Sequence, residues 1–202
     1  MGKLFFVFGP ESAGNHVTSK VLQTMGCFWD EPQSLDKVVT GEKDVEEITD
    51  NENLVLRRSI PHGVHFVDPL FIRSKFKNHS MITIIPVRDW MSNIFSNYYH
   101  RSETVDDALT SLQDAWTHIG ITILYIKPFY FFNTSLLFKD PRSAIEGLEH
   151  FTGLKWPGNT PYESIIYDAD VGKHEVFRKH GFNSIDRQLI RDHIKRPLPL
   201  IL

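Results

Sequence analysis

The stretch FVFGPESAGNHVTSKVL, residues 6–22, decides the fold. Residues 3–8, KLFFVF, form an apolar run of strand length, as expected for a strand that is buried on both faces. A small polar loop then runs from Gly9 to Gly14. Beyond it, apolar residues recur at helical spacing, at Val17, Val21 and Met25. The chain is therefore predicted to run strand, loop and helix within its first 25 residues.

The loop GPESAG, residues 9–14, has the two-glycine spacing of the nucleotide-hydrolase motif G-x-x-x-x-G-K-[ST]. Because it follows a strand and precedes a helix, its backbone amides can point at an anion. Asn15 and His16 stand where those hydrolases carry the lysine and the magnesium-binding hydroxyl, which argues against metal-assisted phosphoryl transfer. Glu11 also counts against a phosphate, since its carboxylate would have to point away or be neutralised. The alternative is a plain strand-to-helix turn capped by Ser12.

Further strands and helices alternate along the chain. Strands are predicted at residues 54–59, 80–87 and 129–133. Helices are predicted after Arg88, after the capping residue Thr104, and from Asp140 to Gly153. The acidic segment 30–53 is interpreted as a surface excursion with a short helix near residues 44–48. This alternation predicts a three-layer αβα fold with a central, mainly parallel, P-loop-like sheet, and residues 1–202 are expected to form one domain.

Composition sets limits on the partners. The chain of 202 residues is 41% hydrophobic and 23% charged with a net charge of −3, so no global basic field recruits nucleic acid. Any anionic ligand must be held by local groups.

The apolar stretch at residues 119–132 is interrupted by Lys127 and Pro128 and is not expected to span a membrane. Cys27 is the single cysteine, which favours a reducing compartment, and we expect a cytoplasmic protein.

A second signal is VRDWMSNIFSNYYH, residues 87–100. Arg88 follows a predicted buried strand at the same edge of the sheet as the first loop, and its guanidinium can grip a phosphate with two hydrogen bonds. Ser96 lies eight residues further on. In a fully helical segment the two Cα atoms would be about 12 Å apart, so the arginine would have to reach back for both to contact one phosphate. Without the loop, a surface arginine paired with Asp89 is the simpler interpretation.

Together these features resemble the sulfotransferases that use 3′-phosphoadenosine 5′-phosphosulfate (PAPS). That family has a P-x-S-G-T loop for the 5′-phosphosulfate, and an arginine with a serine eight residues on for the 3′-phosphate, often followed by Tyr-Tyr-His. PESAGN, residues 10–15, is similar to the first, and Arg88, Ser96 and NYYH match the second. Residues 131–154 are similar to the family's later strand and the helix introduced by Asp-Pro. The likeness runs from about residue 3 to residue 155.

The resemblance implies a set of residues that bind the donor. The 5′ end would lie over Glu11, Ser12, Ala13, Gly14, Asn15 and His16, and the 3′-phosphate on Arg88 and Ser96. The chain also departs from the family. Glu11 stands where a lysine usually contacts the sulfuryl group, and Ala13 looks inserted. The family's C-terminal phosphate loop is only weakly similar to the segment with Arg178 and Lys179, to which no role is assigned.

The segment RRSIPHGVH, residues 57–65, contains the candidate base. Sulfuryl transfer needs such a group to take the acceptor's proton. Histidine suits this role near neutral pH. The family places its catalytic histidine after a comparable strand, and His62 is the best match, with His65 as its rival. Arg58 could supply the positive charge that the first loop lacks. The alternative is that both histidines are loop residues with ordinary contacts.

The sequence thus predicts a sulfotransferase that binds PAPS, releases 3′-phosphoadenosine 5′-phosphate (PAP), and modifies a hydroxyl or amine of a small-molecule or glycan acceptor. No metal is expected, because a sulfuryl group carries less charge than a phosphoryl group. A P-loop nucleotide or small-metabolite kinase and a catalytically inactive nucleotide-binding homologue are the alternatives. Neither the acceptor nor the oligomeric state can be inferred from the sequence.

Overall fold

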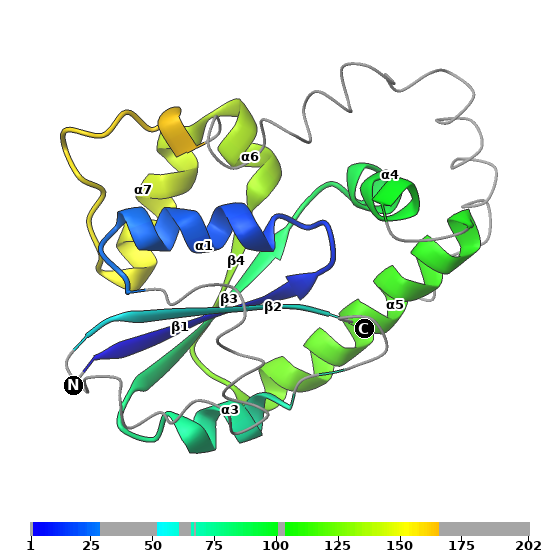
Figure 1. Cartoon of the computed structure of the whole chain (residues 1–202), viewed down its shortest axis with the longest axis horizontal. Helices are drawn as coiled ribbons and strands as arrows, with labels where there is room; N and C mark the ends of the chain where they lie inside the picture. The colour runs from blue at the N-terminus through cyan, green and yellow to red at the C-terminus, as the bar shows by residue number, and fades with distance from the viewer. Residues whose placement is uncertain (1, 29–51, 61–65, 67, 101–103, 166–202) are drawn as a thin grey trace.

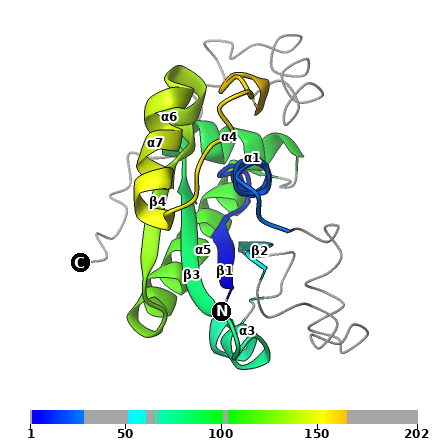
Figure 2. The ribbon, with the colours of Figure 1, turned by 90° about the vertical axis from the view of Figure 1, so that its left-hand side faces the viewer.

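The computed structural model describes residues 2–28, 52–60, 66, 68–100 and 104–165 of the chain. Its centre is a sheet of four parallel strands: β1 (Lys3–Pro10), β2 (Leu54–Ile60), β3 (Ser80–Val87) and β4 (Phe129–Asn133). The strands are ordered β2-β1-β3-β4, which Figure 2 shows from one edge of the sheet to the other. All four follow the predicted ranges within about two residues, as helix and strand boundaries do.

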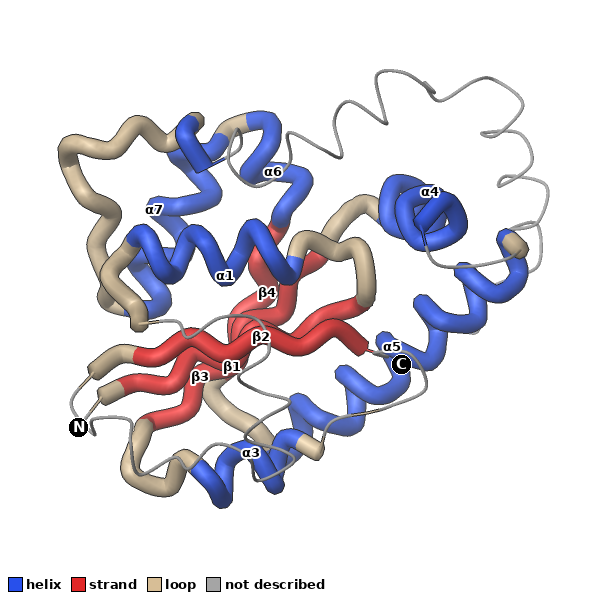
Figure 3. The backbone as a smooth tube through the Cα atoms, in the orientation of Figure 1, coloured by secondary structure: helices blue, strands red, loops and turns tan. Residues whose placement is uncertain are grey.

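Helices cover both faces of this sheet, as Figures 1 and 3 show. One layer contains α1 (Asn15–Thr24), α6 (Thr134–Lys139) and α7 (Pro141–Thr152). The other contains α3 (Pro69–Lys75) and the long α5 (Val105–Tyr125), while α4 (Trp90–His100) packs on α5 near the carboxyl ends of the strands. The predicted three-layer αβα fold with a parallel sheet is confirmed.

Strand β1 lies at the centre of the hydrophobic core. Phe5 and Val7 pack in the cluster with α1 and α7, and Leu4, Phe6 and Phe8 pack in the cluster with α3 and α5; all five side chains are fully buried. Such burial stabilises the fold by about 1.5–3 kcal/mol for each large apolar side chain. The continuous apolar run at residues 3–8 is therefore explained by a strand with helices on both sides.

Helix ends follow the local signals in the sequence. Thr104 and Asp107 form a reciprocal capping box at the start of α5. Helix α7 begins at Pro141 after the capping residue Asp140 and ends at Thr152, followed by the C-cap Gly153, whose φ of 74° favours glycine. The short α3 and α6 were not predicted, because helices of seven and six residues show little apolar periodicity.

Some predictions lie outside the described residues: the short helix near residues 44–48, His62 and His65, and Arg178 with Lys179. The single-domain assignment of residues 1–202 likewise stays a prediction. Among the helices that the structure describes, none combines the length and apolar character needed to cross a membrane.

Candidate functional site at the Gly9–Gly14 turn

The turn from Gly9 to Gly14 joins the carboxyl end of β1 to α1. The Ala13 amide donates to the Pro10 carbonyl at 3.2 Å, and both Ser12 (φ 64°) and Gly14 (φ 99°) adopt left-handed backbone conformations. For a serine this conformation costs about 1 kcal/mol, and such strain is concentrated at ligand sites. Helix α1 starts at Gly14 without a side-chain cap, the arrangement in which first-turn amides can receive an anion.

Asn15 braces the turn from inside. Its Nδ2 atom donates to the carbonyls of Gly9 at 3.1 Å and Pro10 at 2.8 Å, and lies 3.2 Å from Ser59 Oγ on β2. The side chain is only 5% exposed. A Cβ atom on Gly9 would stand 2.9 Å from Asn15 Oδ1 and 2.8 Å from Pro86 Cδ, so glycine is required there. The Asn15 amide is thus used to hold the turn against the neighbouring strands.

Thr134, at the start of α6, is a residue of the site that sequence reasoning missed. Its fully buried hydroxyl lies 2.8 Å from the Ala13 carbonyl and 3.0 Å from the Val87 carbonyl, so it links the turn to the end of β3. A Cβ atom on Gly14 would lie 2.8 Å from Thr134 Cγ2. Ala13 and Thr134 are 121 positions apart, and no local pattern in the sequence indicates their contact.

Arg88 faces the turn, as predicted from its position after β3. Its Nη1 atom donates to the Ser12 carbonyl at 3.3 Å, which joins segments 76 positions apart. Asp89, the alternative partner considered for Arg88, instead caps α4: its Oδ1 atom accepts from the Ser92 amide at 3.0 Å. The structure therefore brings a guanidinium to the same sheet edge as the uncapped start of α1.

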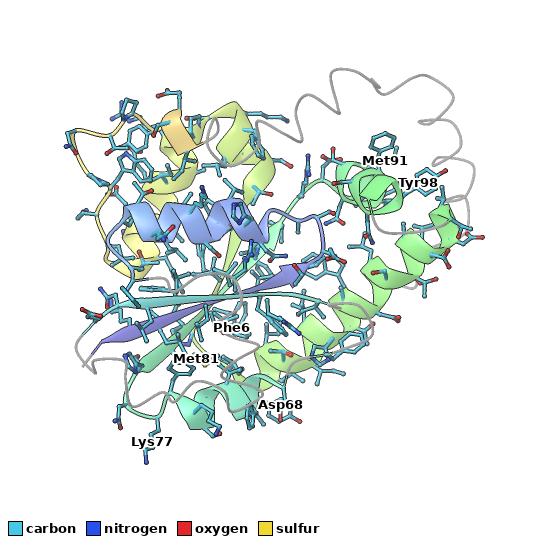
Figure 4. All side chains as sticks on the ribbon, in the orientation of Figure 1. Phe6, Asp68, Lys77, Met81, Met91 and Tyr98 are labelled. Carbon is cyan, nitrogen blue, oxygen red and sulfur yellow. The ribbon has the colours of Figure 1, made fainter. Side chains whose placement is uncertain are left out.

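Ser96 lies on α4, and its residue is only 2% exposed. Asn93 and Asn97, on the same side of the helix by their spacing, are each 3% exposed, and their Oδ1 atoms are buried with no hydrogen-bond partner among the described residues. Figure 4 shows α4 with Met91 and Tyr98 at the end of the molecule next to the carboxyl ends of the strands. The shared phosphate contact of Ser96 and Arg88 stays a prediction.

Two neighbouring arginines of β2 point to opposite faces of the sheet. Arg57 Nη1 lies 2.6 Å from Nδ1 of His16 in the first turn of α1. Because a guanidinium only donates, this contact is a hydrogen bond when Nδ1 of His16 is the unprotonated ring nitrogen. Burial lowers the pKa of Arg57, yet a guanidinium stays protonated in proteins. Arg58, between Leu56 and Ile60 of the cluster with α5, lies on the other face.

The structure thus places residues 11–16 and Arg88 at the carboxyl edge of the sheet, and Ser96 within α4. The half-buried Glu11 donates its backbone amide to the Ile60 carbonyl at 3.3 Å, which fixes the turn to β2. Arg57, which the sequence interpretation did not use, contacts His16 in the first turn of α1 and brings a positive charge there. The alternation of side chains along a strand was the signal that could have shown that Arg57 and Arg58 point to opposite faces of the sheet. What the edge can do chemically is hold an anion by backbone amides and arginine side chains.

No protein-family model and no curated protein sequence matches the chain. Solved structures with a similar fold include the mouse sulfotransferase SULT7A1 complexed with PAP, with 16% identity and a TM-score of 0.55 over 83% of this chain and 64% of that one. The chain thus spans 64% of the length of the mouse protein. They also include the sulfotransferase domain from the curacin biosynthetic pathway, with 11% identity and a TM-score of 0.53 over 98% and 99% of the two chains. The chain has the α/β fold of these sulfotransferases.

Proposed function

We propose that the chain is a PAPS-dependent sulfotransferase. The observation that carries the proposal is the convergence of two distant segments, with Arg88 Nη1 at 3.3 Å from the Ser12 carbonyl, at the edge where parallel α/β sheets bind ligands. The fold shared with a sulfotransferase structure complexed with PAP supports the same choice of nucleotide.

The donor would bind with its 5′-phosphosulfate over residues 11–16. The left-handed Ser12 and Gly14 and the uncapped start of α1 support this, because the first-turn amides of a helix without a side-chain cap can donate to an anion. Arg88 and Ser96 would hold the 3′-phosphate. Since Ser96 is buried, the phosphate would have to enter between the turn and α4 to reach its hydroxyl.

The reaction would be an in-line transfer at sulfur. The acceptor oxygen or nitrogen forms a bond to sulfur, His62 takes the acceptor's proton, and the bond from sulfur to the 5′-phosphate oxygen breaks so that PAP leaves. Positive charge near that oxygen stabilises the leaving group. Arg57, beside His16 on the α1 side of β2, is a candidate for this role, and Arg58 could contribute only from the opposite face of the strand. The acceptor would be a small molecule or a glycan.

A nucleotide-binding protein without transfer activity is the second candidate, and one observation favours it. Glu11 stands where the resemblance leads us to expect a lysine, and the Asn15 amide is hydrogen-bonded to the carbonyls of the turn. Neither side chain offers a cation to a sulfuryl group. Transfer would therefore depend on the arginines of β2 and on Arg88, which follows β3.

Thermal unfolding with nucleotides tests the proposal. PAP at about a hundredfold excess over its Kd should raise the Tm by about 5–10 °C, whereas ADP with magnesium should not. A larger shift with ADP and magnesium would overturn the proposal in favour of a kinase. Transfer of labelled sulfate from PAPS to a panel of hydroxyl and amine acceptors then separates an enzyme from an inactive homologue.

The role of His62 has its own test. His62→Ala should abolish sulfate transfer while PAP still raises the Tm as it does in the wild type, because the base contacts the acceptor and not the nucleotide. His65→Ala is the matched control and should retain transfer. Turnover that survives in His62→Ala would rule out His62 as the base.

A further inference from the structure

A cavity of about 300 Å³ lies at the amino edge of the sheet. It is formed by α3, the segment between α3 and β3, the first residues of β3, and the turn that leads from α5 into β4. Strand β3 separates it from Arg88: seven steps of about 3.3 Å from Ser80 to Val87 give about 23 Å. Figure 4 shows Lys77 and Met81 at the end of the sheet opposite α4. The cavity is therefore distinct from the site at the Gly9–Gly14 turn.

The cavity is basic although the chain as a whole is acidic. Arg73, Lys77 and Lys127 line it, and none of its eight described lining residues is acidic. Among the described residues, none of these three cations forms an ion pair. Three like charges around one hollow repel one another, and an anion bound between them would relieve that repulsion. The net charge of −3 makes this concentration of positive charge a local feature.

His79 supplies a second, independent observation. It lines the same cavity, is only 7% exposed, and both of its ring nitrogens are buried without a hydrogen-bond partner among the described residues. Its ring packs edge-on against Phe76, with the ring centroids 6.1 Å apart. Leaving a buried imidazole unpaired is costly, and either tautomer of the ring has an N–H that an anionic oxygen can accept.

The remaining lining favours an organic ligand over a bare ion. Met81, Ile126 and Pro128 provide an apolar surface beside the cations. A volume near 300 Å³ is at the lower end of the range for small-molecule sites. We propose that this cavity binds a small organic oxoanion, a phosphate or sulfate monoester carried on a compact apolar group, at a site separate from the one that would hold the sulfuryl donor.

The probes are phenyl phosphate and phenyl sulfate, titrated calorimetrically into the full chain. Each joins an ester oxoanion to one apolar ring, and the tighter of the two identifies the ester class. Arg73→Gln/Lys127→Gln should weaken binding at least about tenfold, because two charge-assisted contacts are lost. Lys77→Glu should weaken it further by placing an acid at the rim. Both changes alter exposed side chains, and circular dichroism verifies that the variants fold.

Two control proteins separate this site from the rest of the surface. Arg142→Gln/Lys155→Gln removes one arginine and one lysine that are exposed and do not line the cavity, and it should bind the probes within about twofold of the wild type. Arg88→Gln should also retain binding, since the turn site is not involved. Unchanged affinity in Arg73→Gln/Lys127→Gln would overturn the proposal. So would inorganic phosphate binding as tightly as the esters, or binding of a heparin oligosaccharide without binding of either ester.

Discussion

The hydroxyl of Thr134 lies between two buried carbonyl oxygens that belong to the turn and to β3. Thr134→Val keeps the shape of the side chain and removes the hydroxyl, so the carbonyl that accepts its single proton loses a hydrogen bond. We expect the free energy of unfolding in urea to fall by about 1–3 kcal/mol. Thr134→Ser retains the hydroxyl and is the matched control, with a smaller loss from the missing methyl group. Equal stability of Thr134→Val and the wild type would contradict this role.

Cys27 is a buried thiol, and burial raises its pKa to about 12. Its thiolate fraction in the folded chain is about a thousandfold below that of an ordinary cysteine, because the pKa differs by about three units. A disulfide reagent at pH 8 should therefore modify the native protein far more slowly than the urea-unfolded chain. Equal modification rates in the two states would show that the thiol is not buried.

The same pKa shift predicts how the stability depends on pH. The unfolded chain loses the Cys27 proton near pH 9 and the folded chain only near 12, so its contribution to stability is present below pH 9 and lost as the pH rises above it. Relative to Cys27→Ala, the wild type should lose about 1.4 kcal/mol of unfolding free energy for each pH unit above 9. A constant difference between the two proteins from pH 7 to pH 11 would contradict the shift.

The sequence indicated which residues form the turn but not what each side chain does there. Glycine spacing after an apolar run is a local pattern, and it predicted the turn correctly. The inward direction of the Asn15 amide depends on carbonyls of β1 and a hydroxyl of β2, which only the folded chain brings together. Likewise, proximity in sequence suggested Arg58 as a source of positive charge for the turn. In the folded chain the alternation of side chains along β2 directs Arg57 toward His16.

At the scale of elements, prediction succeeded wherever the signal was continuous. The four strands were recognised from apolar runs, and α5 and α7 from Thr104, Pro141 and Gly153 at their ends. Helices α3 and α6 were missed because a helix of two turns exposes too few positions to show a periodic face. Their capping residues, Asp68 and Asn133, each accept from a backbone amide and were the available signals.

Helix α7 offers a test of such a cap. Hydrogen bonds from the Ser143 hydroxyl and backbone amide lower the pKa of Asp140 below its ordinary value. Because the folded pKa is depressed, the stabilisation is fully present above about pH 4 and is lost as the pH falls through the folded value. Asp140→Asn keeps an acceptor but no charge, so its Tm should fall less than that of the wild type between pH 5 and pH 2. Parallel Tm curves would contradict this assignment.

At the scale of the whole molecule, parallel strands separate two surfaces with different character. Their carboxyl ends carry the glycine turn and Arg88, and their amino ends carry the basic cavity with His79. The order β2-β1-β3-β4 puts the turn between the strand with Arg57 and the strand before Arg88. Arg88 therefore reaches the turn, and Arg57 reaches His16 just beyond it, only because β1 lies between β2 and β3. This arrangement is a consequence of chain topology that no single motif determines.

This topology makes the nucleotide response depend on a residue 76 positions away from the turn. Arg88→Gln should reduce the PAP-induced rise in Tm at a fixed nucleotide concentration and weaken PAP binding at least about tenfold, because a charge-assisted contact to phosphate is lost. Arg142→Gln, which removes a 73% exposed arginine on α7, is the matched control and should respond as the wild type does. Calorimetric titration with PAP measures both. If Arg88→Gln bound PAP with wild-type affinity, the two segments would meet for structural reasons alone, and the nucleotide would have to bind elsewhere on the sheet.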